Sequence, residues 1–209
     1  RALELQPDMA DALLNRSGAL LALKRYDDAL QCIDHLLTVD PGNSEGHYMR
    51  GRLMVELNRP DDAVASCEKA VALNPAFTRA RWTTPLFTLP ILYADESEIA
   101  SRRADYGRRL AALRDDYDAG RTPGDMSKGM GWAQPFFLAY QGLCDRDLQE
   151  MFGGLAGRVM SARYGEAVLA PPPAPGEPVR VGIVSGFFFQ HSVWKIGARA
   201  WVTQLDPRR

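Results

Sequence analysis

A constant interval between prolines organises the N-terminal part of the chain. Pro7, Pro41 and Pro75 recur 34 positions apart. Residues 10–43 and 44–77 align across this interval without gaps. Each segment holds two stretches whose apolar residues recur with helical period, separated by KRYDD or NRPDD. Self-similarity at a fixed period of this length is the signature of a repeat array built from one supersecondary unit.

Matched positions of the two units indicate how their helices approach each other. Small residues, Ser17 and Gly51, occupy one pair of matched positions, and alanine occupies another, Ala29 and Ala63. The period and these residues resemble the tetratricopeptide repeat. The resemblance implies an α-solenoid over residues 1–77, in which neighbouring units bury the apolar face that one unit cannot bury alone.

The same resemblance implies a groove lined by the first helix of each unit. The positions expected to face it are Asp11, Leu14, Asn15 and Gly18 in the first unit and Glu45, Tyr48, Met49 and Arg52 in the second. Among them, we predict that Asn15, Tyr48 and Arg52 contact an acceptor protein or peptide. The alternative interpretation is a solvated face without a particular partner.

The period weakens after residue 77, and we interpret residues 78–165 as a post-repeat helical region. Pro85 and Pro90 are expected to kink or break any helix near them. Acidic residues after Asp95 are typical of a first helical turn and predict a helix to about Tyr117. The arginines of this helix are interpreted as a solvated face: Arg102, Arg103, Arg108, Arg109 and Arg114.

Two further helices are expected before the composition changes. A short apolar helix is predicted over residues 134–143, and a longer one from an N-cap at Asp145 to about Tyr164. Five prolines then fall within residues 166–178. A proline-rich segment is stiff and extended, so we interpret it as an interdomain linker.

Residues 179–196 change from helical to strand periodicity. Residues 179–185 form an apolar run typical of a buried strand, Gly186 permits a turn, and a helix is expected to begin near His191. Three phenylalanines follow the single glycine, which disfavours a dinucleotide-binding or P-loop site. The pattern is typical of the first unit of an α/β lobe.

Three segments are distinctive when they are taken together: residues 80–113, residues 134–149 with QPFFLAYQG and DRDLQ, and residues 181–196 with VGIVSG and HSVWKI. Together they resemble bacterial members of the O-linked N-acetylglucosamine transferase/SPINDLY family, over nearly the whole chain. The resemblance implies a mainly α fold, in which a tetratricopeptide-repeat α-solenoid precedes the first β-strand and α-helix of a Rossmann-like lobe of the GT-B type. Residues 179–209 are expected to be the truncated start of this catalytic lobe.

The activity that this resemblance implies is protein O-glycosylation. A sugar passes from a nucleotide donor to Ser or Thr of an acceptor protein, with inversion and without a metal, while the repeats bind the acceptor. The expected donor is UDP-GlcNAc, with GDP-fucose as the alternative, and no cofactor is expected in this chain. We therefore expect the full-length parent to be an enzyme. The family's donor-binding residues lie mostly in a second lobe, so we expect residues 1–209 alone to be inactive.

His191 matches the histidine that the family carries on the loop after its first strand. The resemblance implies that it acts as general base or orients the acceptor or donor. A helix N-terminus favours the neutral imidazole, which can accept a proton from a hydroxyl nucleophile. A lone histidine beside aromatic residues is also commonly structural, so that interpretation stays open.

Composition restricts the remaining classes of function. A net charge of −1 argues against a dedicated nucleic-acid binder. The three cysteines are dispersed, which disfavours a metal site and is typical of reduced thiols in a cytoplasmic protein. No apolar run approaches the length of a membrane-spanning helix, so no membrane association is expected. The alternative function is a tetratricopeptide-repeat interaction scaffold joined to an unrelated α/β domain.

Overall fold

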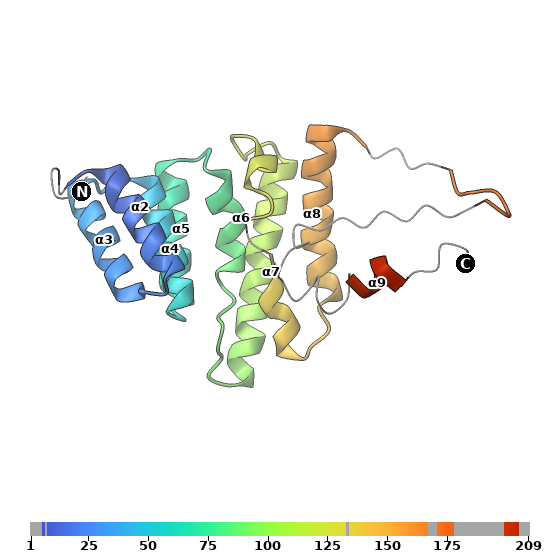
Figure 1. Cartoon of the computed structure of the whole chain (residues 1–209), viewed down its shortest axis with the longest axis horizontal. Coiled ribbons are helices and arrows are strands. Elements are labelled where there is room, and N and C mark those ends of the chain that lie inside the picture. The colour runs from blue at the N-terminus through green and yellow to red at the C-terminus, as the bar shows by residue number, and fades with distance from the viewer. Residues whose placement is uncertain (1–5, 7, 133, 167–170, 178–198, 205–209) are drawn as a thin grey trace. The chain divides into compact units, whose positions relative to one another are not determined.

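The computed structural model describes residues 6, 8–132, 134–166, 171–177 and 199–204. The chain divides into two compact units, Arg1–Ala167 and Val168–Arg209. The described part of the first unit is helical, and the described ranges contain no strand. Its helices are α2 (Ala10–Ala22), α3 (Tyr26–Val39), α4 (Ser44–Glu56), α5 (Pro60–Leu73), α6 (Thr78–Leu86), α7 (Glu96–Asp118) and α8 (Arg146–Tyr164), with the 3-10 helices η1 (Met126–Gly129) and η2 (Phe136–Gln141) (Figure 1).

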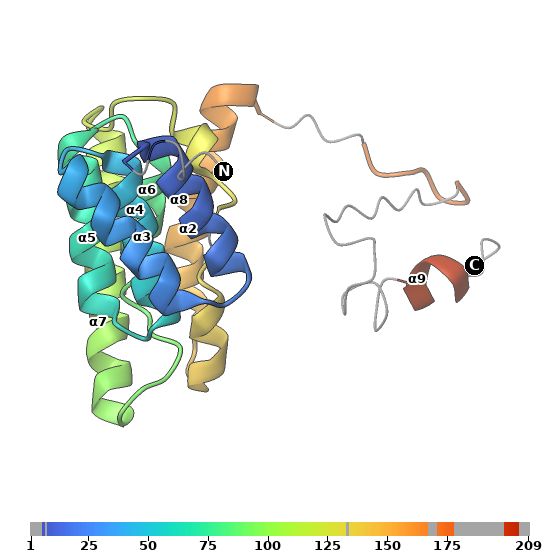
Figure 2. The ribbon, with the colours of Figure 1, turned by 60° about the vertical axis from the view of Figure 1, so that its left-hand side comes forward.

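The two repeat units fold as helical hairpins, α2 with α3 and α4 with α5 (Figure 2). Both turns use a left-handed residue, Lys24 at φ 58° and Asn58 at φ 55°, and these two residues occupy matched positions of the repeat. The second helices then begin at matched positions, Tyr26 and Pro60. Proline is favoured in the first helical turn because its missing N–H has no partner there. The structure therefore confirms the two helix-pair units and the mainly α fold.

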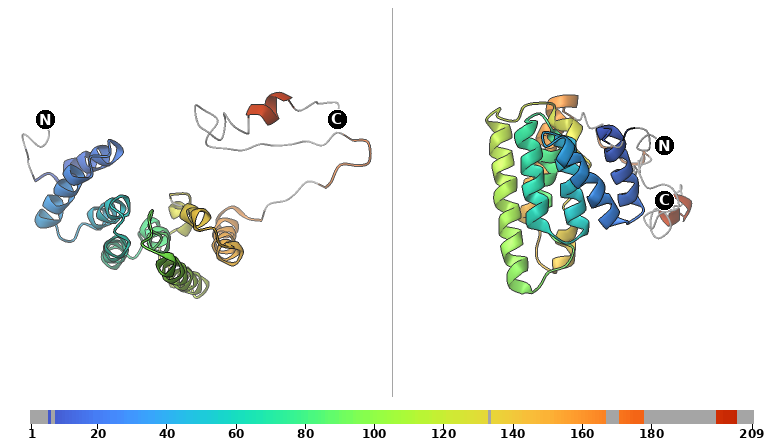
Figure 3. Two further views of the ribbon diagram at one scale, coloured as in Figure 1. Left: turned by 90° about the horizontal axis from the view of Figure 1, so that it is seen from below. Right: turned by 90° about the vertical axis from the view of Figure 1, so that its left-hand side faces the viewer.

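The stacking continues beyond the sequence repeat. Helices α6 and α7 form a further hairpin, which follows α5 in the row seen end-on in Figure 3. Asn58 lies in the turn between α4 and α5 of the second repeat, and it forms hydrogen bonds with the equivalent turn between α6 and α7. Its Oδ1 accepts from the N–H of Ile91 at 2.9 Å and of Leu92 at 3.0 Å, and its Nδ2 donates to the Leu92 carbonyl at 3.0 Å.

The helix break predicted near Pro85 is confirmed, since α6 ends at Leu86 directly after Pro85.

Buried side chains join each hairpin to the next. One cluster packs α2 and α3 against Leu53 of α4, and a second packs α4 and α5 against Ala80 and Phe87. A third joins α6, α7 and α8, with Trp82 donating from Nε1 to the Met126 carbonyl of η1 at 2.9 Å. No hairpin of the described first unit therefore has a core of its own.

Two arginines of α7 tie that helix to α5, which corrects the interpretation of a solvated face. Arg102 donates to Asp61 at 2.5 Å and Arg109 donates to Glu68 at 2.5 Å. Both partners lie 41 positions earlier, so the two helices carry a matched pair of bridges. The hydrogen bond from Arg102 lowers the pKa of Asp61. Sequence alone does not reveal these bridges because their partners lie on another helix.

Residues 134–166 differ in detail from the sequence prediction. The short apolar segment forms a 3-10 helix, Phe136–Gln141, rather than an α-helix. Asp145 stands at the N-cap of α8, but its side chain makes no capping bond and instead accepts from Arg103 at 2.5 Å. The stronger hydrogen bond to a charged guanidinium replaces the bond to a backbone N–H.

The second unit is described only in part. Residues 171–177 of the proline-rich segment are exposed and form neither helix nor strand, and α9 spans Arg199–Gln204. The predicted strand over residues 179–185 and the candidate catalytic His191 lie outside the described residues. The Rossmann-like lobe therefore stays a prediction.

We predict that Gly51→Ala destabilises the protein. A Cβ at Gly51 meets Cys67 Sγ at 2.9 Å and the Ala63 carbonyl at 3.0 Å, where α4 and α5 approach closely. Overpacking of this kind costs about 1–3 kcal/mol. At Gly18 the nearest atom is Met49 Cε at 3.9 Å, so Gly18→Ala should raise the free energy of unfolding by about 0.5–1 kcal/mol. Urea denaturation measures the free energy of unfolding of both variants. If the two substitutions changed it in the same direction, the close contact at Gly51 would be contradicted.

We also predict that one thiol of the native protein reacts readily. Cys144 is exposed, whereas Cys32 and Cys67 are buried, and burial raises the pKa of Cys67 to about 12. The thiolate is the reactive form. Titration with dithionitrobenzoate near neutral pH should therefore detect Cys144 first, and all three thiols only after denaturation. Cys144→Ser should abolish the fast phase; a fast phase that survives this substitution would show that a buried thiol is accessible.

Candidate functional site

A hollow of about 370 Å³ lies between the first helices of the two repeat units. We call it the α2–α4 groove. Its lining comprises Asp11, Leu14, Asn15 and Gly18 of α2 with Glu45 and Met49 of α4. All six were among the positions predicted to face the groove, so the structure confirms their placement.

The groove follows directly from the repeat. Asp11 and Glu45 occupy matched positions of the two units, as do Asn15 and Met49. Residues four apart on a helix share one face. The repeat therefore places the acidic pair, Asp11 and Glu45, on one side of both helices. The second pair, Asn15 and Met49, lies on the same side one helical turn later. Gly18 adds no side chain, and this helps to leave the hollow open.

The three predicted contact residues have different environments. Asn15 is exposed and lines the groove. Arg52 is half-buried beside the groove, and its Nη1 lies 3.8 Å from Met49 Sδ. Tyr48 is only 2% exposed, so the expectation that it faces the groove is wrong. Its ring packs in the core against Phe77, with ring centroids 5.2 Å apart, and burial raises the pKa of its hydroxyl.

Arg79 and Trp132 extend this surface beyond the predicted residues. Arg79 belongs to α6 and lies 34 positions after Glu45, to which it donates at 3.4 Å. Its guanidinium carbon lies 4.1 Å from the ring centroid of Trp132, a residue that is 58% exposed. The 34-residue spacing of the repeat matches Arg79 to Glu45, so the sequence alone could have indicated that Arg79 lies on this surface. Nothing in the sequence indicated Trp132, which reaches Arg79 from the segment after η1.

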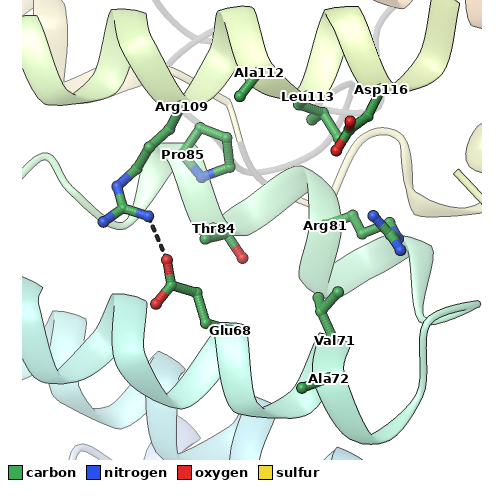
Figure 4. A pocket seen from close by; sticks show the side chains of 10 residues that line it. All are labelled: Glu68, Val71, Ala72, Arg81, Thr84, Pro85, Arg109, Ala112, Leu113 and Asp116. Carbon is green, nitrogen blue, oxygen red and sulfur yellow. Dashed lines mark hydrogen bonds and ion pairs between the residues drawn. The ribbon is translucent and has the colours of Figure 1, made fainter. Parts of the chain in front are cut away.

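A second hollow, the α5–α7 crevice, is also about 370 Å³ in volume. Figure 4 shows Thr84 and Pro85 of α6 between the side chains of α5 and those of α7. The Arg109–Glu68 bridge joins the two helices across it, and Asp116 at its edge accepts from Arg121 at 2.8 Å. An ion pair thus spans this crevice, whereas the partner of Glu45 in the α2–α4 groove, Arg79, comes from α6 and is not among the residues that line that groove. The α2–α4 groove is therefore the stronger candidate for a binding site.

Two other site classes have no support within the described ranges. Those residues contain no group of three or more His, Cys, Asp and Glu side chains placed to hold a metal ion. They also include no helix whose length and apolar character would let it cross a membrane.

Comparison with known families identifies the repeat segment. Two family models, both described as tetratricopeptide repeat, match residues 1–53 and residues 44–77. The matches end at residue 77, where the repeat period weakens. Neither description refers to a glycosyltransferase.

Curated proteins are similar to part of the chain. Protein STIP1 homolog of Dictyostelium discoideum is 29% identical over 98 residues, which are 46% of this chain and 16% of that protein. Hsc70-interacting protein 1 of Drosophila melanogaster is 24% identical over 74 residues, which are 35% of this chain and 20% of that protein. The chain thus matches at most about a fifth of the length of these relatives.

The comparison with solved structures includes two of MamA. One has a TM-score of 0.49 and 16% identity, covering 80% of this chain and 83% of MamA. Another has a TM-score of 0.48 and 15% identity, covering 78% and 82%. From the family matches and the helical hairpins, the finding for the chain itself is that residues 1–77 carry tetratricopeptide repeats.

Proposed function

We propose that this chain is a protein-interaction scaffold whose α2–α4 groove binds an extended peptide segment of a partner protein. The observation that carries the proposal is the groove itself, an open hollow lined by matched positions of two successive repeats. A repeat array exposes one row of side chains per unit along a continuous surface, which suits an extended ligand.

The lining has the chemistry that peptide recognition requires. Asn15 offers an amide that both donates and accepts, as a peptide backbone does. Leu14 and Met49 offer apolar contact, and methionine adapts its shape to different side chains. The name of the Drosophila relative, Hsc70-interacting protein 1, states that it interacts with another protein. This supports a protein as the class of partner.

We expect Asn15→Ala and Arg52→Ala each to weaken peptide binding. Random dodecapeptides selected on the 209-residue chain provide the probes, and fluorescence anisotropy measures their dissociation constants. Loss of one hydrogen bond of about 0.5–1.5 kcal/mol corresponds to roughly two- to tenfold weaker binding.

Gln31→Ala is the matched control, since Gln31 is exposed on the second helix of the same unit. It should leave binding unchanged. If the selected peptides respond to Gln31→Ala but not to Asn15→Ala or Arg52→Ala, the α2–α4 groove is not the binding site.

A second proposal concerns residues 179–209. We propose that a longer protein containing this chain is a glycosyltransferase that transfers N-acetylglucosamine, or alternatively fucose, from its nucleotide donor to Ser or Thr of the protein held by the repeats. The support is the sequence resemblance, above all residues 181–196 with His191. Under this proposal His191 accepts the hydroxyl proton or orients one of the substrates.

His191→Ala should lower turnover of such a protein while leaving its affinity for UDP-GlcNAc or GDP-fucose nearly unchanged. Loss of a general base typically costs about 10²–10⁴-fold in rate. Transfer of labelled sugar to acceptor protein measures the rate, and calorimetry measures donor binding. His47→Ala is the control, because His47 lies on α4 and bonds the Pro41 carbonyl. Unchanged turnover in His191→Ala would remove this residue from the mechanism, and sugar transfer by residues 1–209 alone would refute the expected inactivity of this chain.

A further inference from the structure

We infer that the α2–α4 groove selects a partner segment that carries a lysine or arginine side chain, whose cationic end lies between the carboxylates of Asp11 and Glu45. This inference rests on the proposed peptide binding. It adds the chemistry of the residue that the peptide presents to the groove.

Three successive first helices place one charged residue each at the same position of the repeat. Asp11, Glu45 and Arg79 recur at the repeat interval and belong to α2, α4 and α6. Arg79 Nη1 lies 3.4 Å from Glu45 Oε1. The protein thus already places a guanidinium against one carboxylate of this row, from the side of α6.

The other two members of the row, Asp11 and Glu45, both line the α2–α4 groove. Its volume of about 370 Å³ falls within the range of roughly 300–1,000 Å³ typical of ligand sites. Gly18 contributes to the opening, since the atom nearest to a Cβ built there is Met49 Cε at 3.9 Å. A side chain from outside the chain therefore has room in the groove that the two carboxylates line.

The lining matches both parts of a long basic side chain. Leu14 and Met49 provide an apolar surface for the methylene stem, and the carboxylates provide acceptors for its charged end. The side chain of Glu45 is 41% exposed and Asp11 is exposed, so both remain partly hydrated before binding. A cation can consequently pair with them without the full cost of burying a charge.

Helix electrostatics alone do not account for this arrangement. Asp11 and Glu45 stand in the first turns of their helices, where the helix dipole favours a carboxylate. That effect requires no hollow between them, and the equivalent position of α6 carries Arg79 instead. Asp27 stands in the first turn of α3 without lining the groove, which makes it a matched control.

Arg52 and Arg79 are cations at the border of the groove, and they define the competing outcome. Arg79 is engaged by Glu45 and stacked on Trp132, whereas Arg52 contacts Met49. A partner that bound chiefly through Arg52 would present a carboxylate rather than a cation. The charge of the selected peptides therefore separates the two possibilities.

The test selects random dodecapeptides on the complete chain at low salt and repeats the selection on the Asp11→Asn/Glu45→Gln variant. We expect lysine and arginine to be enriched on the unmodified chain and not on the variant. Peptides selected on the unmodified chain should bind the variant about tenfold more weakly by fluorescence anisotropy, because two exposed ion pairs are lost. Asp27→Asn should not change their affinity, and added salt should reduce the difference between the proteins.

Gly18→Leu tests the hollow without altering any charge. Its side chain extends into the groove from a helical position with open space around it, so binding should fall while the thermal midpoint is unchanged or raised. Should the double variant fail to fold, as judged by circular dichroism, the single substitutions Asp11→Asn and Glu45→Gln carry the charge test.

Two negative results have different meanings. Selected peptides that lose affinity in Gly18→Leu and Asn15→Ala, yet show no enrichment of lysine or arginine, overturn this inference and leave peptide binding in place. Enrichment of aspartate or glutamate would likewise overturn this inference and leave peptide binding in place. Peptides that are insensitive to every substitution in the groove overturn the proposed function as well.

Discussion

Each helical hairpin leaves an apolar face that only the next hairpin can bury, and the fold of the helical unit Arg1–Ala167 depends on this constraint. Leu53 of α4 completes the core of α2 and α3, and Ala80 of α6 completes the core of α4 and α5. Stability in such an array arises from contacts between neighbours as much as within one pair. The stacking also fixes the spacing of the first helices, and the α2–α4 groove is the space that remains between two of them.

Close backbone approach within a hairpin and polar bonds between hairpins supplement this apolar packing. Gly51 lets α4 lie directly against the Ala63 carbonyl of α5, where a side chain has no room. Asn58 joins the turn of one hairpin to the turn of the next through three hydrogen bonds. The Arg102–Asp61 and Arg109–Glu68 bridges join α7 to α5. These contacts carry the architecture of the repeats into a segment whose sequence no longer shows the period.

Peptide binding and sugar transfer are compatible functions for one protein. In the first, the groove is the site and the repeats suffice. The proposed sugar transfer would additionally require residues 179–209, most of which lie outside the described residues. The family matches over residues 1–77 support the first role at the level of the repeat, and the glycosyltransferase role rests on the sequence resemblance.

The sequence by itself predicted the two helix-pair units, and the repeat template placed eight residues at the groove, of which six line it. It could do so because a fixed period repeats every local environment, so that one template places each position. Where the period ends, prediction was less complete: the helices were expected, but the bridges from α7 to α5 were not. Those bridges join residues 41 positions apart, and no local pattern encodes that pairing.

Tertiary structure alone decided which of the predicted contact residues reach the surface. Tyr48 and Asn15 both satisfied the template, yet the ring of Tyr48 is taken into the core beside Phe77 while Asn15 stays exposed. A large aromatic side chain gains more by leaving water than a small amide does. Tertiary structure also brought Trp132 onto Arg79, from a segment without repeat character. Sequence periodicity fixes which face of a helix a residue occupies, whereas contacts with neighbouring elements decide whether that face remains accessible.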